Sequence, residues 1–259
     1  MGDLAFCWDA AGGGVVIDLR VGRWETALAD VGEVDAVICD PPYGARTHAG
    51  NANMTQFALD GYAERRNLSY IHWTAAEVQA FVAHWSPRCR SWFCAMTSDD
   101  LIPAWRDAYS DAGRLDFAPV PCLWHRPRMG GDGPGSGTVY LMVARPRHRR
   151  FSSWGSLPCW YGPIGAPRAT DPDHHIGGKP LSIMLEIVRD YTRPGNLVVD
   201  PTAGGATTLI AAHTLGRRAI GAEMDPATAA KAQARIDRHL RQWTLFEPAA
   251  LCSQPRLEV

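Results

Sequence analysis

The sequence lacks the features that would carry a chain into or across a membrane. None of its 259 residues falls in an apolar stretch long enough to cross a bilayer. The opening segment, MGDLAFCWDAAGGG, has no basic region followed by an apolar one, so no secretory signal is expected. Its Met-Gly start has no Ser or Thr at the sixth position, which argues against myristoylation. We therefore expect a cytoplasmic protein.

Cysteine and histidine are present, but not in a metal-binding pattern. The seven cysteines are scattered and none forms Cys-x-x-Cys, while Cys89 and Cys94 are too far apart for a zinc knuckle. We interpret them as reduced thiols, most of them in the core. His174 and His175 are adjacent, so their side chains point apart, and the sequence offers no third ligand. We expect no metal site.

An excess of positive charge is also missing. The net charge is −1, with 46% apolar and 20% charged residues, which is ordinary for a globular chain. A nucleic-acid partner would then have to meet a local basic patch rather than the whole surface. The candidates for phosphate or base contact are Arg126, Arg128, Arg145, Arg147, Arg149 and Arg150. A solvated loop is the alternative interpretation of these residues.

Strand-like and helix-like segments alternate along the chain. Strands are expected at residues 14–19, 34–40, 91–98, 114–126, 138–145, 196–200 and 217–225. Helices are expected at residues 23–31, 78–85 after a capping box of Thr74 and Glu77, 99–113 capped by Ser98, 179–194, 204–216 and 226–240. This alternation predicts one α/β domain with a mostly parallel central sheet and helices on both faces. Residues 44–72 and 146–178 show no clear period.

The first informative stretch is VICDPPYG, residues 37–44. An apolar run stops at Asp40, and Pro41 and Pro42 then fix the backbone and remove two donors. An aromatic ring follows at Tyr43, where a surface turn is expected. By itself this pattern fits either a stiff strand-ending turn or an active site.

The second informative stretch is VVDPTAGGATTLIAA, residues 198–212. A strand ends at Asp200, Gly204 and Gly205 let a ligand approach the backbone, and a helix start offers free N–H groups. The spacing fits neither Gly-x-Gly-x-x-Gly nor the P-loop, so the ligand need not carry phosphates. Glu223, at the end of the next strand, is placed to take ribose hydroxyls. A tight turn with a surface acid is the alternative.

Together the two stretches resemble the S-adenosylmethionine-dependent amino-methyltransferases of DNA, which act on N6 of adenine or N4 of cytosine. Their catalytic hallmark is (Asp/Asn/Ser)-Pro-Pro-(Tyr/Phe/Trp), seen here at residues 40–43, and their cofactor turn resembles residues 200–208. The His-x-x-x-Lys-Pro element of the family matches His175 to Pro180. The catalytic motif precedes the cofactor turn, which is the permuted order of the β group. The middle of the chain is similar to phage and prophage members, which implies a bacterial or phage-infected host cell.

The resemblance implies a Rossmann-like methyltransferase fold in a single domain, residues 1–259. It implies a catalytic half at about 14–125, a target-recognition insertion at about 126–178 and a cofactor-binding half at about 179–242. The implied catalytic residues are Asp40, Pro41, Pro42 and Tyr43. The implied positions for S-adenosylmethionine are Asp40, Lys179, Asp200, Pro201, Thr202, Ala203, Gly204, Gly205, Thr207, Thr208 and Glu223.

The implied activity is site-specific methylation of double-stranded DNA, as in restriction-modification systems, on a base flipped out of the helix. Residues 44–72 are expected to close over the DNA. Members of the group are often dimers, so a homodimer is a further expectation. Asp at the first motif position favours adenine N6. The alternatives are an N4-cytosine enzyme, an RNA amino-methyltransferase and a catalytically weak DNA-binding relative.

Other methyltransferase classes fit less well. The protein-glutamine enzymes place the cofactor turn upstream, and the Pro-Cys pairs at Cys122 and Cys159 lack the context that a cytosine-C5 nucleophile needs. Three departures from the family pattern stand out: Thr202 in place of Phe, Ala206 in place of the last Gly, and DLRVGRWE near the first strand. With Ala206 we expect the turn to avoid the backbone angles that only glycine tolerates.

Overall fold

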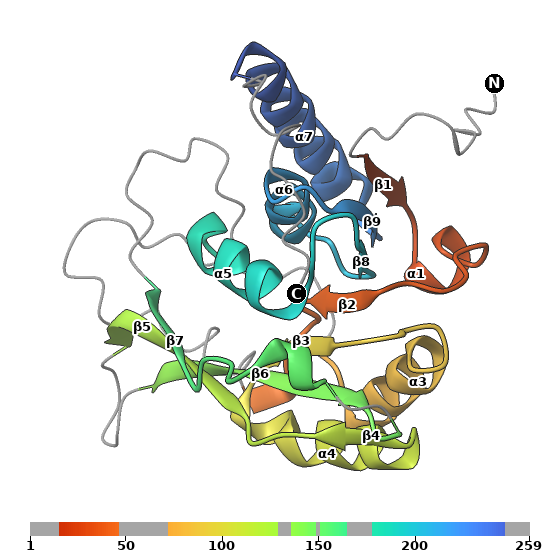
Figure 1. The fold of residues 1–259 in the computed structure, drawn as a ribbon, viewed down its shortest axis with the longest axis vertical. Coiled ribbons are helices and arrows are strands. Elements are labelled where there is room, and N and C mark those ends of the chain that lie inside the picture. Colours follow the sequence, from red (N-terminus) through yellow and green to blue (C-terminus); the bar gives the residue numbers. More distant parts are fainter. Residues whose placement is uncertain (1–15, 47–71, 129–135, 149–150, 165–177, 247–259) are drawn as a thin grey trace.

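The computed structural model describes residues 16–46, 72–128, 136–148, 151–164 and 178–246 (Figure 1). The strands are β1 (Ile17–Val21), β2 (Ala36–Cys39), β3 (Phe93–Thr97), β4 (Arg114–Asp116), β5 (Val120–Arg128), β6 (Ser136–Pro146), β7 (Tyr161–Ile164), β8 (Leu197–Asp200) and β9 (Arg218–Glu223). The α-helices are α1 (Trp24–Ala27), α3 (Ala75–Trp85), α4 (Ile102–Asp111), α5 (Leu181–Tyr191), α6 (Thr207–Thr214) and α7 (Pro226–Phe246).

These strands form one sheet in the order β1-β9-β8-β2-β3-β6-β5-β7, with β4 beside β6. The pairs from β1 to β3 are all parallel, whereas β6 runs antiparallel to β3 and to β5. The predicted mixed α/β fold with a mostly parallel sheet is confirmed. In Figure 1, α5, α6 and α7 lie on one side of the sheet, and α3 and α4 on the other.

Alternate residues of each central strand enter two separate cores. In β2, Ile38 packs with buried residues of α5, α6 and α7, whereas Val37 and Cys39 pack with residues of α3 and α4. The same alternation holds in β3 and β8. Both faces of the strands are apolar because both are covered, which explains why the strands read as continuous apolar runs.

The neighbours β2 and β8 mark the point where the strand order reverses. From β2 the chain proceeds to β3 on one side, and from β8 it proceeds to β9 on the other. Parallel α/β sheets bind ligands at the carboxyl ends of the strands next to such a point. Asp40 follows β2 directly and Asp200 ends β8, so both turns singled out in the sequence lie at this edge.

Several predicted elements differ in extent. The expected helix at 23–31 is only the four-residue α1, after which Leu28 and Val31 reach the core from turns. The expected strand at 114–126 is two strands, β4 and β5, because the chain breaks around Pro119. Strand β7 lies in a segment where no period was seen. Among the described residues, no helix is long and apolar enough to span a membrane.

Candidate active site

Asp40 pairs with a lysine that is far away in sequence. The Lys179 Nζ lies 2.6 Å from Asp40 Oδ2, and their side chains are 5% and 22% exposed. Lys179 precedes α5, which packs against the sheet beside β2, and this brings together two residues 139 positions apart. The pair is therefore a largely buried ion pair at the carboxyl edge of the sheet.

Tyr43 completes this cluster. Its hydroxyl donates to Asp40 Oδ1 at 2.8 Å, and the Lys179 Nζ lies 4.9 Å from the centroid of its ring. Each carboxylate oxygen of Asp40 thus accepts one hydrogen bond, and the ammonium lies between the carboxylate and an aromatic ring. Pro41 is buried and Pro42 is half-buried, so the chain between the two polar residues is rigid.

The chain after Tyr43 is held by two residues that follow β3. Gly44 N donates to Ser98 Oγ at 3.1 Å, and Ser98 Oγ donates in turn to Asp100 Oδ1. A Cβ at Gly44 would lie only 2.1 Å from Asp100 Oδ2. Ser98 stands at the N-cap position as predicted, but its hydroxyl makes no capping bond and instead accepts from Gly44 in the turn after β2. No local sequence signal links residues 54 positions apart.

Asp200 is the buried acid of the second turn. It is 2% exposed, and it accepts hydrogen bonds from Thr202 N at 3.1 Å and Thr202 Oγ1 at 3.4 Å. Burial, with a smaller contribution from the nearby Asp40, raises the pKa of Asp200 to about 7, although the hydrogen bonds from Thr208 and Thr202 act in the opposite direction. Thr202 therefore supports the acid that ends β8, a role that a Phe could supply only through its backbone.

Glu223 ties the second turn to the end of β9. Its Oε2 accepts from Gly204 N at 3.0 Å, and its Oε1 accepts from Asp225 N at 2.8 Å. Ala203 N also donates to Ala222 O at 2.8 Å. Each oxygen of the carboxylate keeps a further lone pair, so the ribose contact of Glu223 stays a prediction.

The expectation for Ala206 is wrong. Its φ is 61° and its ψ is 25°, so this alanine adopts the left-handed conformation that the turn needs although glycine is absent. It is the N-cap of α6 and makes no side-chain capping bond. The conformation costs about 1–2 kcal/mol for a residue with a Cβ. The turn keeps the backbone path that glycine would give, and the surrounding contacts must compensate the strain.

The remaining predicted cofactor positions gather in the same turn. All five are buried: Pro201, Ala203 and Gly205 lie between β8 and α6, and Thr207 and Thr208 begin α6. These residues, which are close together in the sequence, are also together in the structure, at the carboxyl end of β8. Which of them contact a cofactor stays a prediction.

The basic residues divide between the two edges of the sheet. Arg126 and Arg128 belong to the carboxyl end of β5, which points in the same direction as β2, although their side chains lie outside the described residues. Arg145 and Arg147 lie at the opposite edge, because β6 is antiparallel and Ala144 pairs with Phe93 at the start of β3. The structure therefore does not bring these two to the catalytic edge.

Local contacts give Arg145 and Arg147 other partners. The Arg145 guanidinium lies 5.8 Å and 5.4 Å from the ring centroids of Phe117 and Phe151. Arg147 donates to the Arg114 carbonyl at 3.2 Å. The predicted Arg149, Arg150, His174 and His175 fall outside the described residues, as does nearly all of 44–72.

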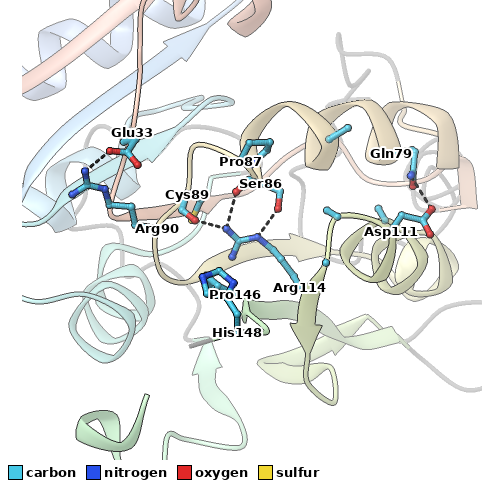
Figure 2. Close-up of a pocket in the computed structure, with 14 residues that line it drawn as sticks. Glu33, Gln79, Ser86, Pro87, Cys89, Arg90, Asp111, Arg114, Pro146 and His148 are labelled. Atoms are coloured by element: carbon cyan, nitrogen blue, oxygen red, sulfur yellow. Dashed lines mark hydrogen bonds and ion pairs between the residues drawn. The ribbon is translucent and has the colours of Figure 1, made fainter. Parts of the chain in front are cut away.

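A cavity of about 580 Å³ also lies at this opposite edge (Figure 2). Its lining includes Glu33, Arg90, Asp111, Arg114 and His148, a mixture of both charges. Arg114 is 2% exposed and donates to Ser86 and to the carbonyls of Ser91 and Cys89, so it fixes the chain between α3 and β3. The cavity is remote from both turns, and nothing in it matches the chemistry predicted there.

The fold and the paired turns are those of an α/β protein, and comparisons with known proteins show similarity to DNA methylases over part of the chain. Residues 135–234 match a family model for N6 and N4 methylases described as DNA methylase. The type II methyltransferase M.HindIII of Haemophilus influenzae is 42% identical over 53 residues, which is 20% of this chain and 17% of that protein. The chain covers only 22% of the length of the putative methylase YubD of Escherichia coli and 17% of that of M.HindIII, which are two of the curated relatives it matches.

Solved structures agree with the fold over most of the chain. The M1.HpyAVI–SAM complex has a TM-score of 0.62 and 19% identity, covering 85% of this chain and 100% of that chain. The cytosine-N4-specific PvuII DNA methyltransferase has a TM-score of 0.60 and 12% identity, covering 89% and 93%. The predicted resemblance to the DNA amino-methyltransferases and the methyltransferase fold are confirmed. The comparisons do not separate the N6 and N4 types.

Proposed function

We propose that the protein transfers a methyl group from S-adenosylmethionine to the exocyclic amine of a base flipped out of double-stranded DNA, and that the base is adenine, methylated at N6. The observation that carries the proposal is the position of the Lys179 ammonium. Its nitrogen lies 2.6 Å from Asp40 Oδ2 and 4.9 Å from the Tyr43 ring centroid. The site already accommodates a nitrogen donor between a carboxylate and an aromatic ring, as the target amine requires.

The amine needs such a site because its lone pair is delocalised into the base. Flipping the base costs a few kcal/mol, and Tyr43 stacking would return about 1–3 kcal/mol. Asp40 accepts one amine N–H and the Pro41 carbonyl accepts the other, which localises the lone pair on nitrogen. Acceptors that are aimed in advance lower the barrier because they need no reorganisation. The rigid Pro41-Pro42 segment and the hydrogen bond from Tyr43 supply that alignment.

The transfer itself requires no covalent enzyme intermediate. S-adenosylmethionine supplies an electrophilic methyl on its sulfonium; the new C–N bond forms as the old S–C bond breaks. The methylated nitrogen then carries a positive charge, and Asp40 is the nearest group able to take its extra proton. Before Asp40 Oδ2 can accept this proton, the Lys179 ammonium must move away, or the oxygen must accept from both donors through its two lone pairs.

The second turn suits this cofactor by the chemistry of its groups. Gly204 has a φ of 51°, and a Cβ there would have only the Thr202 carbonyl within reach at 4.0 Å, so a ligand could lie against the backbone. Glu223 would hold the ribose hydroxyls. The buried Asp200, whose pKa is raised to about 7 chiefly by burial, would be favoured in its charged form by a nearby sulfonium.

Asp rather than Ser at the start of the catalytic motif favours adenine over cytosine. The N4-cytosine alternative is retained because a neighbour of that type shares the fold. Double-stranded DNA is the proposed partner, with Arg126 and Arg128 near the substrate edge, and a homodimer is the proposed assembly. An RNA amino-methyltransferase and a catalytically weak DNA-binding relative are the remaining outcomes of the test.

The experiment supplies methyl-labelled S-adenosylmethionine and duplex DNA of varied sequence, followed by digestion to nucleosides. We expect the label in N6-methyladenine. Label in N4-methylcytosine would overturn the choice of base, and label in RNA alone would overturn the choice of polymer. Cofactor binding without any transfer would identify a binding protein.

A matched pair of variants tests the mechanism. Asp40→Ala should abolish transfer and leave S-adenosylmethionine binding measurable, because most of the implied cofactor positions lie on the second turn and are retained. Asp111→Ala removes an exposed acid at the opposite edge of the sheet and should leave transfer unchanged. Turnover retained by Asp40→Ala would refute the role given to Asp40.

A further inference from the structure

The second turn is contacted by an arginine from a separate helix. Arg235 lies on α7, is 9% exposed, and directs its guanidinium toward the start of α6. One of its nitrogens donates to the Gly205 carbonyl at 2.8 Å and to Thr207 Oγ1 at 2.8 Å. These two acceptors flank Ala206, so a single side chain holds both neighbours of the residue in the left-handed conformation.

Ala206 explains why such a contact is needed. Its strained backbone begins α6 without a side-chain cap, and an alanine would relax toward ordinary angles if nothing opposed it. Relaxation would rotate the peptide between Gly205 and Ala206. The guanidinium opposes this rotation because it fixes the Gly205 carbonyl on one side and Thr207 on the other.

Helix stability alone does not account for this cation. The amino end of a helix carries a partial positive charge, so an arginine beside it is electrostatically unfavourable for the helix. Burial of a guanidinium adds a desolvation cost. What Arg235 gains at this place is a pair of hydrogen bonds to the turn itself. Its position is therefore explained by the geometry of the turn.

We propose that Arg235 is a positioning residue for the cofactor turn: it locks Gly205 and Thr207 so that the turn is already in its ligand-binding shape. The inference rests on the proposed function, because it takes S-adenosylmethionine as the ligand of the turn. Arg235 acts through the Gly205 carbonyl and the Thr207 hydroxyl, and in this proposal it contacts neither the target base nor the reacting atoms. Its loss should weaken cofactor binding and leave the chemistry at saturating cofactor nearly intact.

The test compares Arg235→Gln and Arg235→Lys with the full-length wild type. We expect Arg235→Gln to raise the Kd and the KM for S-adenosylmethionine about 10-fold, with kcat at saturation within about 3-fold of wild type. Arg235→Lys should be intermediate, because an ammonium lacks the planar geometry of a guanidinium. The matched control is Arg241→Gln, an exposed arginine on the same helix, which should bind the cofactor normally.

A rescue separates positioning from general destabilisation. Adding Ala206→Gly to Arg235→Gln should restore most of the affinity, because glycine adopts the left-handed angles without strain. An unchanged Kd in Arg235→Gln, or a lost affinity that Ala206→Gly does not restore, would overturn the inference while leaving the proposed function intact. A wild-type protein that binds no S-adenosylmethionine in calorimetry would overturn both.

Discussion

The turn after β2 and the turn after β8 lie next to each other but are made rigid in different ways. The first, Asp40 to Gly44, is stiffened by its own prolines and by an ion pair with Lys179. The second, Asp200 to Ala206, contains glycines and a strained alanine, and it depends on groups from elsewhere in the chain. Glu223 holds Gly204, and Arg235 holds Gly205.

This difference follows from what each turn is proposed to do. The first must aim two acceptors at one amine, and errors of about 1 Å at such a site cost about 100-fold in rate. The second must open its backbone to a ligand, which requires small residues with little rigidity of their own. The first turn therefore combines the rigidity of its prolines with contacts from Lys179 and Ser98, whereas the second turn has no prolines after Pro201 and depends on contacts from other elements. Four variants test this comparison.

The largest effect is expected from Lys179→Met. The change leaves Asp40 without its ion-pair partner in a largely buried site, so the carboxylate loses its fixed orientation. We expect methyl transfer at saturating cofactor to fall about 100- to 1,000-fold, a much larger change than the change in cofactor Kd that the loss of Lys179 would cause. The chain has only one other lysine, Lys231, which is exposed on α7 and provides the control Lys231→Met. Equal losses in the two variants would contradict the role of Lys179.

The next effect is a pH dependence caused by Asp200. Burial raises the pKa of this carboxyl from 3.8 to about 7 in the folded protein, so the protonated form is the one that folding favours. Its contribution to stability is complete below about pH 4 and is lost as the pH rises to about 7. Asn at this position mimics the protonated acid and does not titrate. Relative to Asp200→Asn, the wild type should lose on the order of 3 kcal/mol between these pH values, measured by denaturant unfolding.

The control for this measurement is Asp237→Asn, an exposed acid on α7. Its difference from the wild type should stay nearly flat over the same range. A wild type that gains stability relative to Asp200→Asn as the pH rises would show that Asp200 is ionised throughout.

A smaller effect is expected from Gly44→Ala, which tests the link from the first turn to β3. Gly44 is not in the left-handed region, so the added Cβ strains no backbone angle, but it would displace the Asp100 carboxylate. We expect kcat to fall about 10-fold without a change in cofactor Kd, because the hydrogen bond from Gly44 to Ser98 is disturbed. The double variant with Asp100→Ala should be no worse than Asp100→Ala alone. Additive losses would contradict the steric explanation.

The smallest effect is expected from Ala206→Gly in the wild-type background. Relief of the left-handed strain is offset by the loss of a buried methyl group and by the greater entropy of glycine in the unfolded chain. The free energy of unfolding should change by less than about 1 kcal/mol. Ala206→Val should destabilise by about 2 kcal/mol, because a β-branched residue tolerates these angles poorly. A large gain from glycine would mean that the surroundings do not compensate the strain.

The sequence was sufficient for features that are encoded locally. Apolar runs ending at Asp40 and Asp200 predicted two strand-ending turns, and the capping box at Thr74 and Glu77 is present with both of its hydrogen bonds. The alternation of strands and helices predicted the sheet. Each of these signals extends over only a few residues, so it can be recognised in the sequence without knowledge of the fold.

The contacts that complete the site were not predictable in this way. Lys179 approaches Asp40 only because α5 packs beside β2, and Ser98 meets Gly44 only because β3 pairs with β2. The conformation of Ala206 was predicted wrongly. An alanine in place of glycine suggested that the turn avoids left-handed angles, but whether such a strained residue is tolerated depends on tertiary contacts that the sequence does not show. Arg145 and Arg147 looked like a substrate patch until the antiparallel direction of β6 placed them at the other edge.

The pairing of β1 with β9 and of β2 with β8 has a consequence for how the protein is made. Ile17 pairs with Ala219, and Ala36 pairs with Val198, so the centre of the sheet joins segments from the two ends of the described chain. Such distant pairings close large loops and slow folding. On the ribosome, the turn after β2 can gain β3 as a neighbour early, but its other neighbouring strand, β8, is synthesised much later. A chain that stops before residue 197 would lack the second turn and the strand that flanks β2 on that side.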